Sequence, residues 1–576
     1  MNFASSPVLT LRLPVWRSRL LLLAFFFGFC VLGARAVYLQ GWNNDFLQAK
    51  GESRYSRVIE ITANRGRIVD RHGELLAIST PVKSVWAIPS EVELDKDKLG
   101  KLSALLEMPP QDLQKRFAET NRDFVYVKRQ ISPELADRVA ELRVPGLFQS
   151  REFRRYYPGG EVMSHVLGFT GVDDIGQEGV ELAFQEQLAG KAGSRRVIKD
   201  RMGQIIEDLQ SIKSAQEGRD LTLALDARIQ NLVFGQLKAA METNKAKAGG
   251  IVVLDITTGE MLALANFPTY NPNNRTHLSG ASLRNRVLTD TFEPGSTLKP
   301  FTIATAIEAG QVTPNTTIQT SPGTLTIGKA TIHDAHAEGL LTVSQVIQKS
   351  SNVGSAKIAL NLPPESMWNT FNSVGLGTAP KLGFPGEATG RVRPFKTWKP
   401  IEQATMAYGH GISVSLVQLA RAYSIFARDG DLVPISLVKV DTPPAAQSVI
   451  SAETARALRA MLESVVGPGG TAPRAQIMGY RVAGKTGTAH KQENGAYAAN
   501  KYVSSFVGFA PVSNPRLVVA VMIDEPSGGQ YYGGSVAAPV FAKVMEGALR
   551  ALGVPPDAPM KPVVLPPPGQ EVAESI

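Results

Sequence analysis

The stretch Glu293-Pro294-Gly295-Ser296-Thr297-Leu298-Lys299-Pro300 places a hydroxyl and an amine three residues apart, directly after a Pro-Gly turn. Pro300 has no N–H and is tolerated only near the first turn of a helix, so we expect a helix to begin close to Ser296. Residues three apart share a helix face, so the Lys299 amine would lie beside the Ser296 hydroxyl and could accept its proton. The first backbone N–H groups of the helix would face negative charge developing nearby. The stretch therefore predicts an activated serine nucleophile.

The same Ser-x-x-Lys pattern occurs a second time, at Ser436-Leu437-Val438-Lys439. This copy lies in a segment, 434–440, whose composition predicts a strand. Residues three apart point to opposite faces of a strand, so we expect the second copy to be inert. Because the pattern is short and common by chance, the assignment of Ser296 depends on the rest of the chain.

Composition limits the classes of protein to which the chain can belong. Its 576 residues, 43% hydrophobic and 20% charged, suffice for several folded domains. The formal net charge of +9 is modest, and no block of Lys and Arg stands out, which argues against nucleic-acid binding. The single cysteine, Cys30, excludes an intrachain disulfide and a cysteine-based metal site. His333-Asp334-Ala335-His336 resembles a metal-ligand spacing but lacks helical context and further ligands, so we expect neither a metal nor a cofactor.

An apolar segment near the N-terminus predicts a membrane anchor. Residues 20–34 carry no charge, and after Arg35 the apolar run continues to Leu39. A helix over 20–39 would be about 30 Å long, which just spans a bilayer, with Arg35 close enough to one end to reach the interface. The preceding residues contain Arg12, Arg17 and Arg19 and no acid, which predicts a cytoplasmic segment 1–19 and export of the remainder.

A cleaved signal peptide is the alternative, because Ala34-Arg35-Ala36 resembles a small-x-small cleavage site. The arginine inside that site and the apolar continuation to Leu39 favour an uncleaved anchor. Both interpretations export residues 43–576, and a mature N-terminus at Val37 would identify the signal peptide.

Residues 43–225 contain no catalytic constellation, and we expect a structural or partner-binding module. A strand, a turn at His72-Gly73 and a second strand are predicted over 63–77. Helices are predicted over 96–106, 110–119 and 133–142.

Residues 226–552 predict an α+β domain. Asp226 is a candidate N-cap for a helix over 227–242, and strands at 251–255 and 260–265 form a hairpin. Further helices are predicted near 342–349, 351–361 and 414–428, and strands at 480–489, 503–509 and 517–523. Strands first, helices in the middle and strands last indicate one sheet assembled from both ends of the domain, with helices packed on it. The proline-rich segment 553–576 is expected to be an extended or flexible tail.

Two later motifs offer groups that a serine nucleophile needs. Ser350 and Asn352 lie two residues apart at the boundary between two predicted helices, where they could relay a proton and hold a substrate amide. The alternative is a serine that caps the next helix.

The second motif is Lys485-Thr486-Gly487-Thr488 in a predicted strand. Thr486 and Thr488 share one face, and two hydroxyls beside a lysine would recognise a carboxylate. Gly487 would leave room for a substrate backbone, and N–H groups there could complete an oxyanion hole. The alternative is an ordinary strand with a bulge glycine.

Ser-x-x-Lys, Ser-x-Asn and Lys-Thr-Gly in this order are the signature of penicillin-recognising serine enzymes. The chain resembles the class B, monofunctional penicillin-binding proteins, and among them most closely the FtsI-type, division-specific peptidoglycan D,D-transpeptidases. Further segments that carry the resemblance are Arg65-Gly66-x-Ile68-x-Asp70-Arg71-x-Gly73, Arg154-Arg155-Tyr156-Tyr157-Pro158, Tyr270-Asn271-Pro272-Asn273-Asn274, Arg284-Asn285-Arg286, Ile401-Glu402-Gln403-Ala404-Thr405, Gly409-His410-Gly411 and Tyr531-Tyr532-Gly533-Gly534.

The resemblance implies an architecture. A transmembrane helix would precede an elongated, mixed α/β pedestal or dimerisation domain over 43–225. A penicillin-binding transpeptidase domain would follow over 226–552, with an antiparallel sheet covered by helices, as in serine β-lactamases. The protein would be a single-pass protein of the cytoplasmic (inner) membrane with its bulk in the periplasm.

The resemblance also implies a reaction. Ser296 would attack the carbonyl between the last two D-alanines of a peptidoglycan stem peptide, and an amine from a neighbouring stem would resolve the acyl-enzyme into a cross-link. Lys299 would deprotonate Ser296, although the identity of the base in this family is disputed. β-Lactams would acylate the same serine. The partners would be a septal glycan polymerase and other membrane proteins of the division machinery.

The remaining motif residues receive roles from the same resemblance. Ser350 and Lys485 would pass the proton towards the leaving amine, and Asn352 would hold the peptide backbone. Thr486 and Thr488, with Gly487 between them, would bind the terminal carboxylate. The N–H groups of Ser296 and Thr488 would form the oxyanion hole.

Three alternatives stay open. An elongation-type transpeptidase would act on the side wall instead of the septum. A D,D-carboxypeptidase or β-lactamase would use water as the acceptor, and the anchor and exported module argue against a β-lactamase. A β-lactam sensor or inactive scaffold would keep the fold only, but the 19-residue N-terminal segment is too short for a folded signalling domain.

Overall fold

The computed structural model describes residues 14–42, 56–122, 124–199, 205–276, 278–493, 496–563 and 573–575. They form two compact units, each built from three segments. The first unit takes the described residues of Met1–Ala63, Lys83–Glu152 and Lys191–Gln216, and the second takes those of Asn64–Val82, Phe153–Gly190 and Glu217–Ile576. The second unit therefore combines residues from both sides of the expected boundary at 225/226.

The N-terminal helix α1 (Val15–Val37) continues into a short π-helix, η3 (Tyr38–Trp42). Within the described chain, Val15–Gly41 is the one helical stretch long and apolar enough to cross a membrane, with a mean hydropathy of 2.3. The predicted span 20–39 lies inside it. Residues 1–13 of the predicted cytoplasmic segment lie outside the described residues.

The first unit contains the three helices predicted for the exported module. They are α3 (Lys96–Leu106), α4 (Pro110–Phe117) and α5 (Pro133–Glu141), and they bury Leu102, Leu113 and Val139 against β4 (Val125–Ile131). Asp95 caps α3 and Ser132 caps α5 through their side chains, which explains why both helices begin where predicted. A separate antiparallel sheet has the order β1 (Ser56–Ile61), β6 (Gly193–Lys199) and β7 (Ile205–Lys213).

The segments of the second unit that precede residue 217 are joined by a buried ion-pair cluster. Arg65 Nε lies 2.6 Å from Glu181 Oε2, and Arg155 Nε lies 2.6 Å from Glu181 Oε1. All three side chains are almost completely buried. Nearby, β2 (Ile68–Val69) pairs with the start of β3 (Leu75–Ala87) across the predicted turn, and with β8 (Leu221–Thr222). The Arg65 and Arg155 motifs therefore serve the structure of this unit.

The centre of the second unit is a five-stranded antiparallel sheet. Its order is β10 (Met261–Phe267), β9 (Ala248–Asp255), β19 (Leu517–Asp524), β18 (Ala496–Ala510) and β17 (Ala483–Glu493). Ile251 of β9 pairs with Val521 of β19, although 270 residues separate them. The prediction of one sheet assembled from both ends of the domain is confirmed.

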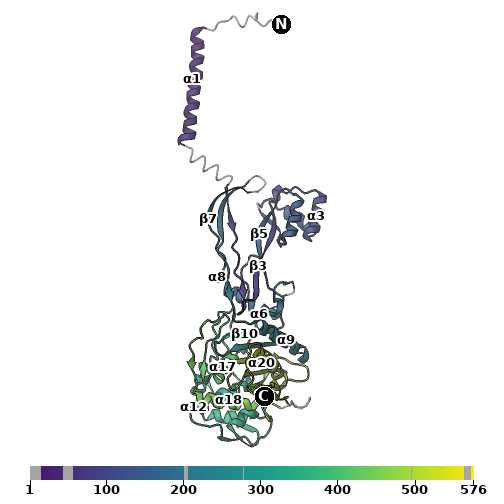
Figure 1. Cartoon of the computed structure of the whole chain (residues 1–576), viewed down its shortest axis with the longest axis vertical. Coiled ribbons are helices and arrows are strands. Elements are labelled where there is room, and N and C mark those ends of the chain that lie inside the picture. Colours follow the sequence, from purple (N-terminus) through teal and green to yellow (C-terminus); the bar gives the residue numbers. More distant parts are fainter. Residues whose placement is uncertain are drawn as a thin grey trace. The chain divides into compact units, whose positions relative to one another are not determined.

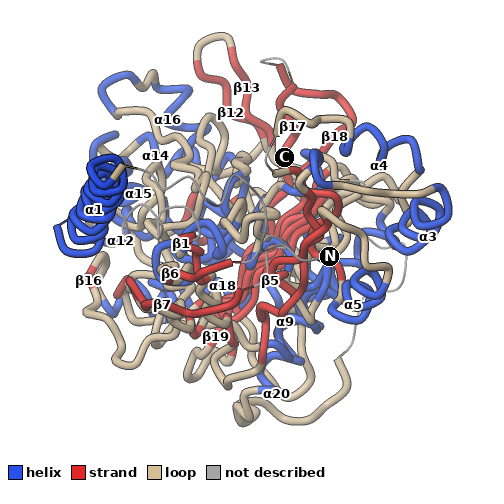
Figure 2. Tube along the Cα trace, turned by 90° about the horizontal axis from the view of Figure 1, so that it is seen from above, coloured by secondary structure: helices blue, strands red, loops and turns tan. Residues whose placement is uncertain are grey.

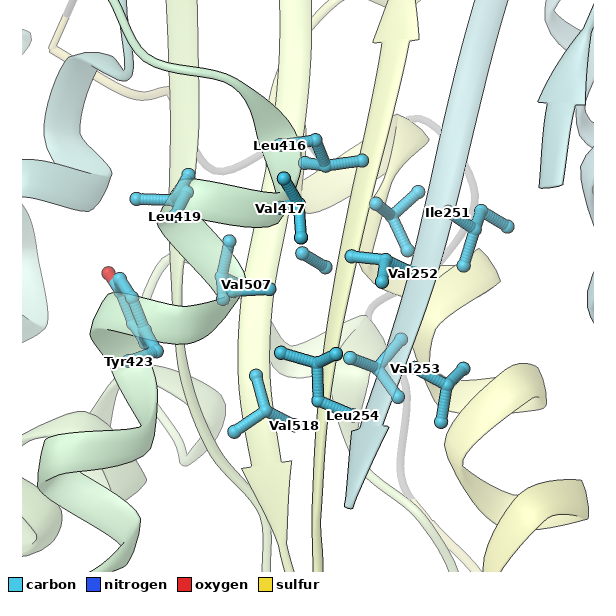
Figure 3. Close-up of a cluster of buried hydrophobic side chains, with 14 of the residues drawn as sticks. Ile251, Val252, Val253, Leu254, Leu416, Val417, Leu419, Tyr423, Val507 and Val518 are labelled. Carbon is cyan, nitrogen blue, oxygen red and sulfur yellow. The ribbon is translucent and has the colours of Figure 1, made fainter. Parts of the chain in front are cut away.

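Helices cover both faces of this sheet. On one face, α17 (Leu416–Ala427) packs Val417 against a cluster that contains Val252 and Val507 (Figure 3). On the other face lie α9 (Ala227–Asn244) and α20 (Ala538–Ala551), which also contact each other (Figure 1). The rings of Phe506 and Phe541 meet there with centroids 4.7 Å apart, and because Phe506 and Val507 are neighbours on one strand they point to opposite faces. Asp226 caps α9 as predicted.

The long middle part of the second unit supplies the helices and small strands around the site. The helices are η6 (Gly295–Leu298), α12 (Lys299–Glu308), α13 (Val343–Lys349), α14 (Asn352–Leu360), α15 (Pro364–Ser373), α16 (Pro400–Met406) and α18 (Ala452–Val466). The short helix α19 (Gly533–Val536) follows β19. Two small antiparallel sheets pair β11 (Thr317–Gln319) with β14 (Leu340–Thr342) and, in a hairpin between them in sequence, β12 (Thr324–Ile327) with β13 (Ala330–His333). In Figure 2 the β12–β13 and β17–β18 hairpins project at the same edge of the view.

The described residues after Leu552 differ from the expected flexible tail. Asp557 accepts hydrogen bonds from the N–H groups of Arg481 (2.7 Å) and Ser513 (3.1 Å), and Tyr480 donates to the Val554 carbonyl (2.7 Å). Residues 564–572 and 576 lie outside the described residues. The segment 573–575 returns to the main body of the second unit, and proline content alone gave no sign of these contacts.

Candidate active site

The predicted nucleophile and its amine lie together at the junction of η6 and α12. Ser296 sits in the 3-10 turn, and Lys299 is the first residue of α12, with Pro300 in the first turn as expected. Lys299 Nζ donates to Ser296 Oγ at 2.9 Å. A hydrogen bond to α17 holds the turn in place, because the Tyr423 hydroxyl donates to the Thr297 carbonyl at 2.6 Å.

Ser350 brings a second hydroxyl to the same amine. It ends α13 in the left-handed conformation, with φ of 61°, and this turns both its carbonyl and its hydroxyl towards Lys299. The Lys299 amine lies 2.5 Å from the carbonyl oxygen and 3.0 Å from the hydroxyl. The alternative role of a helix cap falls on the next residue, because Ser351 Oγ accepts the Gly354 N–H at 2.8 Å.

Lys485 of β17 completes a chain of polar groups. Its amine donates to Ser350 Oγ at 2.9 Å, so the order is Ser296, Lys299, Ser350, Lys485. Lys299, Ser350 and Lys485 have no exposed surface. Burial, together with the positive charge of Lys485, holds the pKa of Lys299 well below its ordinary value, and burial lowers the pKa of Lys485 to about 8. The site therefore favours a neutral amine beside Ser296 and a cation beside Ser350.

Asn352 lies in the first turn of α14, and its amide donates to the His333 carbonyl at 3.2 Å. The neighbouring Asp334 carboxylate accepts from Ser351 Oγ (2.6 Å) and from the Val353 N–H (3.0 Å). The His333–His336 segment thus anchors the start of α14. In the described part of the chain, no group of three or more His, Cys, Asp or Glu side chains is placed to hold a metal ion.

Thr486 and Thr488 face the loop and helix on the outer side of β17. Thr486 Oγ1 lies 3.0 Å from Thr471 Oγ1, and Thr488 Oγ1 accepts the Gly533 N–H at 2.9 Å. Sequence reasoning did not identify Thr471, which no motif marks.

Gly487 is required by the packing of β17 against the Pro294 turn. A Cβ at this position would lie 2.5 Å from Ser505 Oγ and 2.8 Å from the Pro294 carbonyl oxygen. Both distances are far below van der Waals contact, so β17 approaches the Pro294 turn closely only because residue 487 lacks a side chain.

A further polar cluster adjoins Ser296 and was not predicted. The Glu293 carboxylate accepts from the Gly411 N–H (2.9 Å), Gln492 Nε2 (2.9 Å) and the Tyr497 hydroxyl (3.1 Å). It links the turn before Ser296 to the Gly409–Gly411 loop and to the β17–β18 hairpin. Burial lowers the pKa of the adjacent His410 to about 4, so this imidazole is neutral at pH 7.

The second Ser-x-x-Lys copy is not assembled into a site. Ser436 Oγ donates to the Val438 carbonyl at 2.7 Å, and Lys439 Nζ donates to the Arg71 carbonyl at 3.1 Å. The segment forms isolated bridges and not a continuous strand. The Ser436 and Lys439 side chains hydrogen-bond to two different backbone carbonyls, which agrees with the prediction that this copy is inert.

The chain is similar to known proteins along most of its length. Residues 249–546 match the family model of the penicillin binding protein transpeptidase domain, and residues 60–223 match that of the penicillin-binding protein dimerisation domain. The chain is 42% identical over 548 residues to the probable peptidoglycan D,D-transpeptidase PenA of Neisseria gonorrhoeae, which covers 94% of each chain. It is also 42% identical over 549 residues to the peptidoglycan D,D-transpeptidase FtsI of Escherichia coli K12, which covers 94% of this chain and 93% of that one.

Among solved structures, the transpeptidase domain of Burkholderia pseudomallei penicillin-binding protein 3 is similar, with 52% sequence identity and a TM-score of 0.55. The match covers 58% of this chain and 98% of that one.

Proposed function

The chain belongs to the class B penicillin-binding proteins, and from this membership and its site geometry we propose that it is a serine-type peptidoglycan D,D-transpeptidase of the division septum. The observation that carries the proposal is the unbroken contact chain from Ser296 through Lys299 and Ser350 to Lys485. It supplies a nucleophile, a base and a proton path in one water-poor site.

Acylation begins with proton transfer from Ser296 to the neutral Lys299 amine, which lies within hydrogen-bonding distance. Ser296 Oγ then attacks the carbonyl between the last two D-alanines of a stem peptide. The backbone N–H groups of Ser296 and Thr488 bind the developing oxyanion. The buried site excludes water, which strengthens these electrostatic interactions.

Collapse of the tetrahedral intermediate requires a proton on the leaving amine. Lys299, now protonated, passes it through the Ser350 hydroxyl, which the Lys485 ammonium polarises. Thr486 and Thr488 bind the terminal carboxylate through their hydroxyls, and Asn352 holds the peptide amide. After D-alanine leaves, the amine of a second stem attacks the ester carbonyl, and the same groups act in reverse to form the cross-link and release Ser296.

The anchor and the domain order of the chain support a location of this reaction at the outer side of the cytoplasmic membrane. Residues 20–39 anchor the protein in the cytoplasmic membrane with a cytoplasmic segment 1–19, and the bulk lies in the periplasm. Residues 43–225 form the non-catalytic pedestal or dimerisation domain, residues 226–552 the transpeptidase domain, and residues 553–576 the tail. The partners are a septal glycan polymerase and other membrane proteins of the division machinery.

The direct test supplies the purified full chain with nascent glycan carrying pentapeptide stems. The proposal predicts cross-linked muropeptides by mass spectrometry, and none with Ser296→Ala. Release of D-alanine without cross-links would identify a D,D-carboxypeptidase instead. Depletion of the protein in growing cells separates the two transpeptidase types, because loss of a septal enzyme yields filaments and loss of an elongation enzyme yields round cells.

A further inference from the structure

The carboxylate of Glu574, the third residue from the end of the chain, lies in the site that the motifs assign to a substrate carboxylate. Glu574 Oε2 accepts from Thr488 Oγ1 at 2.7 Å, and Oε1 accepts from the Gly534 N–H at 2.8 Å. Thr488 Oγ1 in turn accepts the Gly533 N–H at 2.9 Å, so the hydroxyl proton is directed at the carboxylate.

Ser575, the residue after Glu574, contacts another segment near the motif residues. Ser575 Oγ accepts the Ala335 N–H at 3.0 Å, close to the segment that anchors Asn352. Glu574 and Ser575 are only 3% and 7% exposed. The end of the chain thus contacts β17 through Thr488 and the segment that follows β13 through Ala335.

We propose that the C-terminal segment Ala573–Ser575 is an internal ligand of the carboxylate subsite, and that it competes with the peptide substrate for this subsite. The inference rests on the proposed function, because that function assigns Thr488 and Thr486 to the terminal carboxylate. A glutamate side chain presents the same charge and the same two acceptor oxygens as a peptide C-terminus, so one set of donors recognises both.

Hydrogen-bond donors and a positive charge partly compensate the burial of the Glu574 carboxylate. A buried carboxylate is costly unless donors and opposite charge compensate it. Here a hydroxyl and a backbone N–H donate to it, and the Lys485 ammonium attracts it. Burial raises the pKa of Glu574 despite these contacts, so they compensate the buried charge only in part.

Competition by a tethered segment lowers the apparent rate constant at which Ser296 is acylated by any ligand that uses the carboxylate subsite. A ligand reaches only the fraction of molecules in which the segment has left, and the apparent affinity falls by that fraction. If the segment occupies the subsite for about nine-tenths of the time, its removal raises the second-order rate constant of acylation about tenfold.

The test compares acylation of Ser296 by a fluorescent penicillin in four forms of the protein. They are the native sequence, Glu574→Gln, a chain that ends at Val563, and Glu546→Gln as a matched loss of one carboxylate on the surface of α20, where Glu546 pairs with Arg550. We expect both changes at the tail to raise the second-order rate constant about three- to tenfold, and Glu546→Gln to leave it unchanged. A thermal unfolding midpoint is recorded for each form, so that a folding defect is not taken for a change in the site.

Equal rate constants for the native, Glu574→Gln and shortened chains would overturn the inference. Acceleration on shortening but not with Glu574→Gln would overturn the role of the carboxylate. Failure of all forms to acylate would instead contradict the proposed function, so the two ideas fail in different ways.

Discussion

The side-chain amine of Lys299 lies 2.9 Å from the hydroxyl of Ser296, and both groups are buried. A lysine in water is protonated at pH 7 and cannot accept a proton. Burial and the neighbouring Lys485 lower the pKa of Lys299 until the neutral amine becomes accessible. A lowered pKa is what the proposed role of Lys299 as the base for Ser296 requires.

Alanine substitutions at two adjacent serines should have separate effects, one on the acylation rate and the other on stability. Ser350→Ala removes the hydroxyl between Lys299 and Lys485, so we expect acylation by a β-lactam to slow by about 10²–10⁴-fold with little change in the unfolding midpoint. Ser351→Ala removes the cap of α14 and should lower the free energy of unfolding by about 1 kcal/mol. Stopped-flow acylation and chemical denaturation of both variants measure the two effects. Equal acylation by Ser350→Ala and the native chain would contradict the relay.

The acylation rate should depend on pH in the form of a bell. Lys299 reacts as a neutral amine, so the rate falls as the pH drops through its lowered pKa. Lys485 acts as a cation, so the rate falls again as the pH rises past its pKa of about 8. Rates measured from about pH 5 to about pH 10 would show both limbs. In Lys485→Arg the alkaline limb should move upward, because a guanidinium stays charged; an unmoved limb would assign it to another group.

Substitution by alanine should change the stability of the protein in opposite directions at two glycines. Gly487→Ala places a Cβ 2.8 Å from the Pro294 carbonyl oxygen, which forces β17 away from the turn that carries Ser296. We expect lower stability and strongly reduced acylation. Gly235 lies exposed within α9, and no atom comes within 4 Å of the position that a Cβ would take there, so Gly235→Ala should stabilise the protein by about 0.5–1 kcal/mol. Denaturation curves of both variants test this, and a destabilising Gly235→Ala would be inconsistent with the packing described.

The Arg65–Glu181–Arg155 cluster should support stability and not chemistry. Glu181→Gln leaves two buried guanidinium groups without their counter-charge, and we expect a loss of about 3–5 kcal/mol. Glu546→Gln, which removes a partly exposed i,i+4 pair on α20, should cost under about 0.5 kcal/mol. Both variants should keep the native pH profile of acylation at a temperature where they remain folded. A changed profile in Glu181→Gln would show that the cluster influences the site.

Much of the second unit was predictable because its signals are local. The spacing of Ser296 and Lys299, the cap at Asp226 and the hairpin of β9 and β10 all depend on residues close in sequence. The order of the three motifs then indicated the family. The central sheet followed from the positions of apolar runs at the two ends of the domain.

What escaped prediction depends on contacts between distant segments. Thr471 meets Thr486 only after α18 folds against β17, and the need for glycine at 487 appears only when the strand meets the Pro294 turn. The ion pair between Arg65 and Glu181 joins residues that are 116 positions apart in the sequence. Glu574 belongs to a proline-rich tail whose composition predicts no fixed partner, and its contact with Thr488 spans 86 residues.

The most direct measurement is mass spectrometry of the protein after brief exposure to a β-lactam. The account predicts one long-lived covalent adduct on the peptide that contains Ser296, no adduct in Ser296→Ala, and full labelling in Ser436→Ala, which alters the second Ser-x-x-Lys copy. An adduct on another residue, labelling that persists in Ser296→Ala, or rapid release of the hydrolysed drug would contradict it.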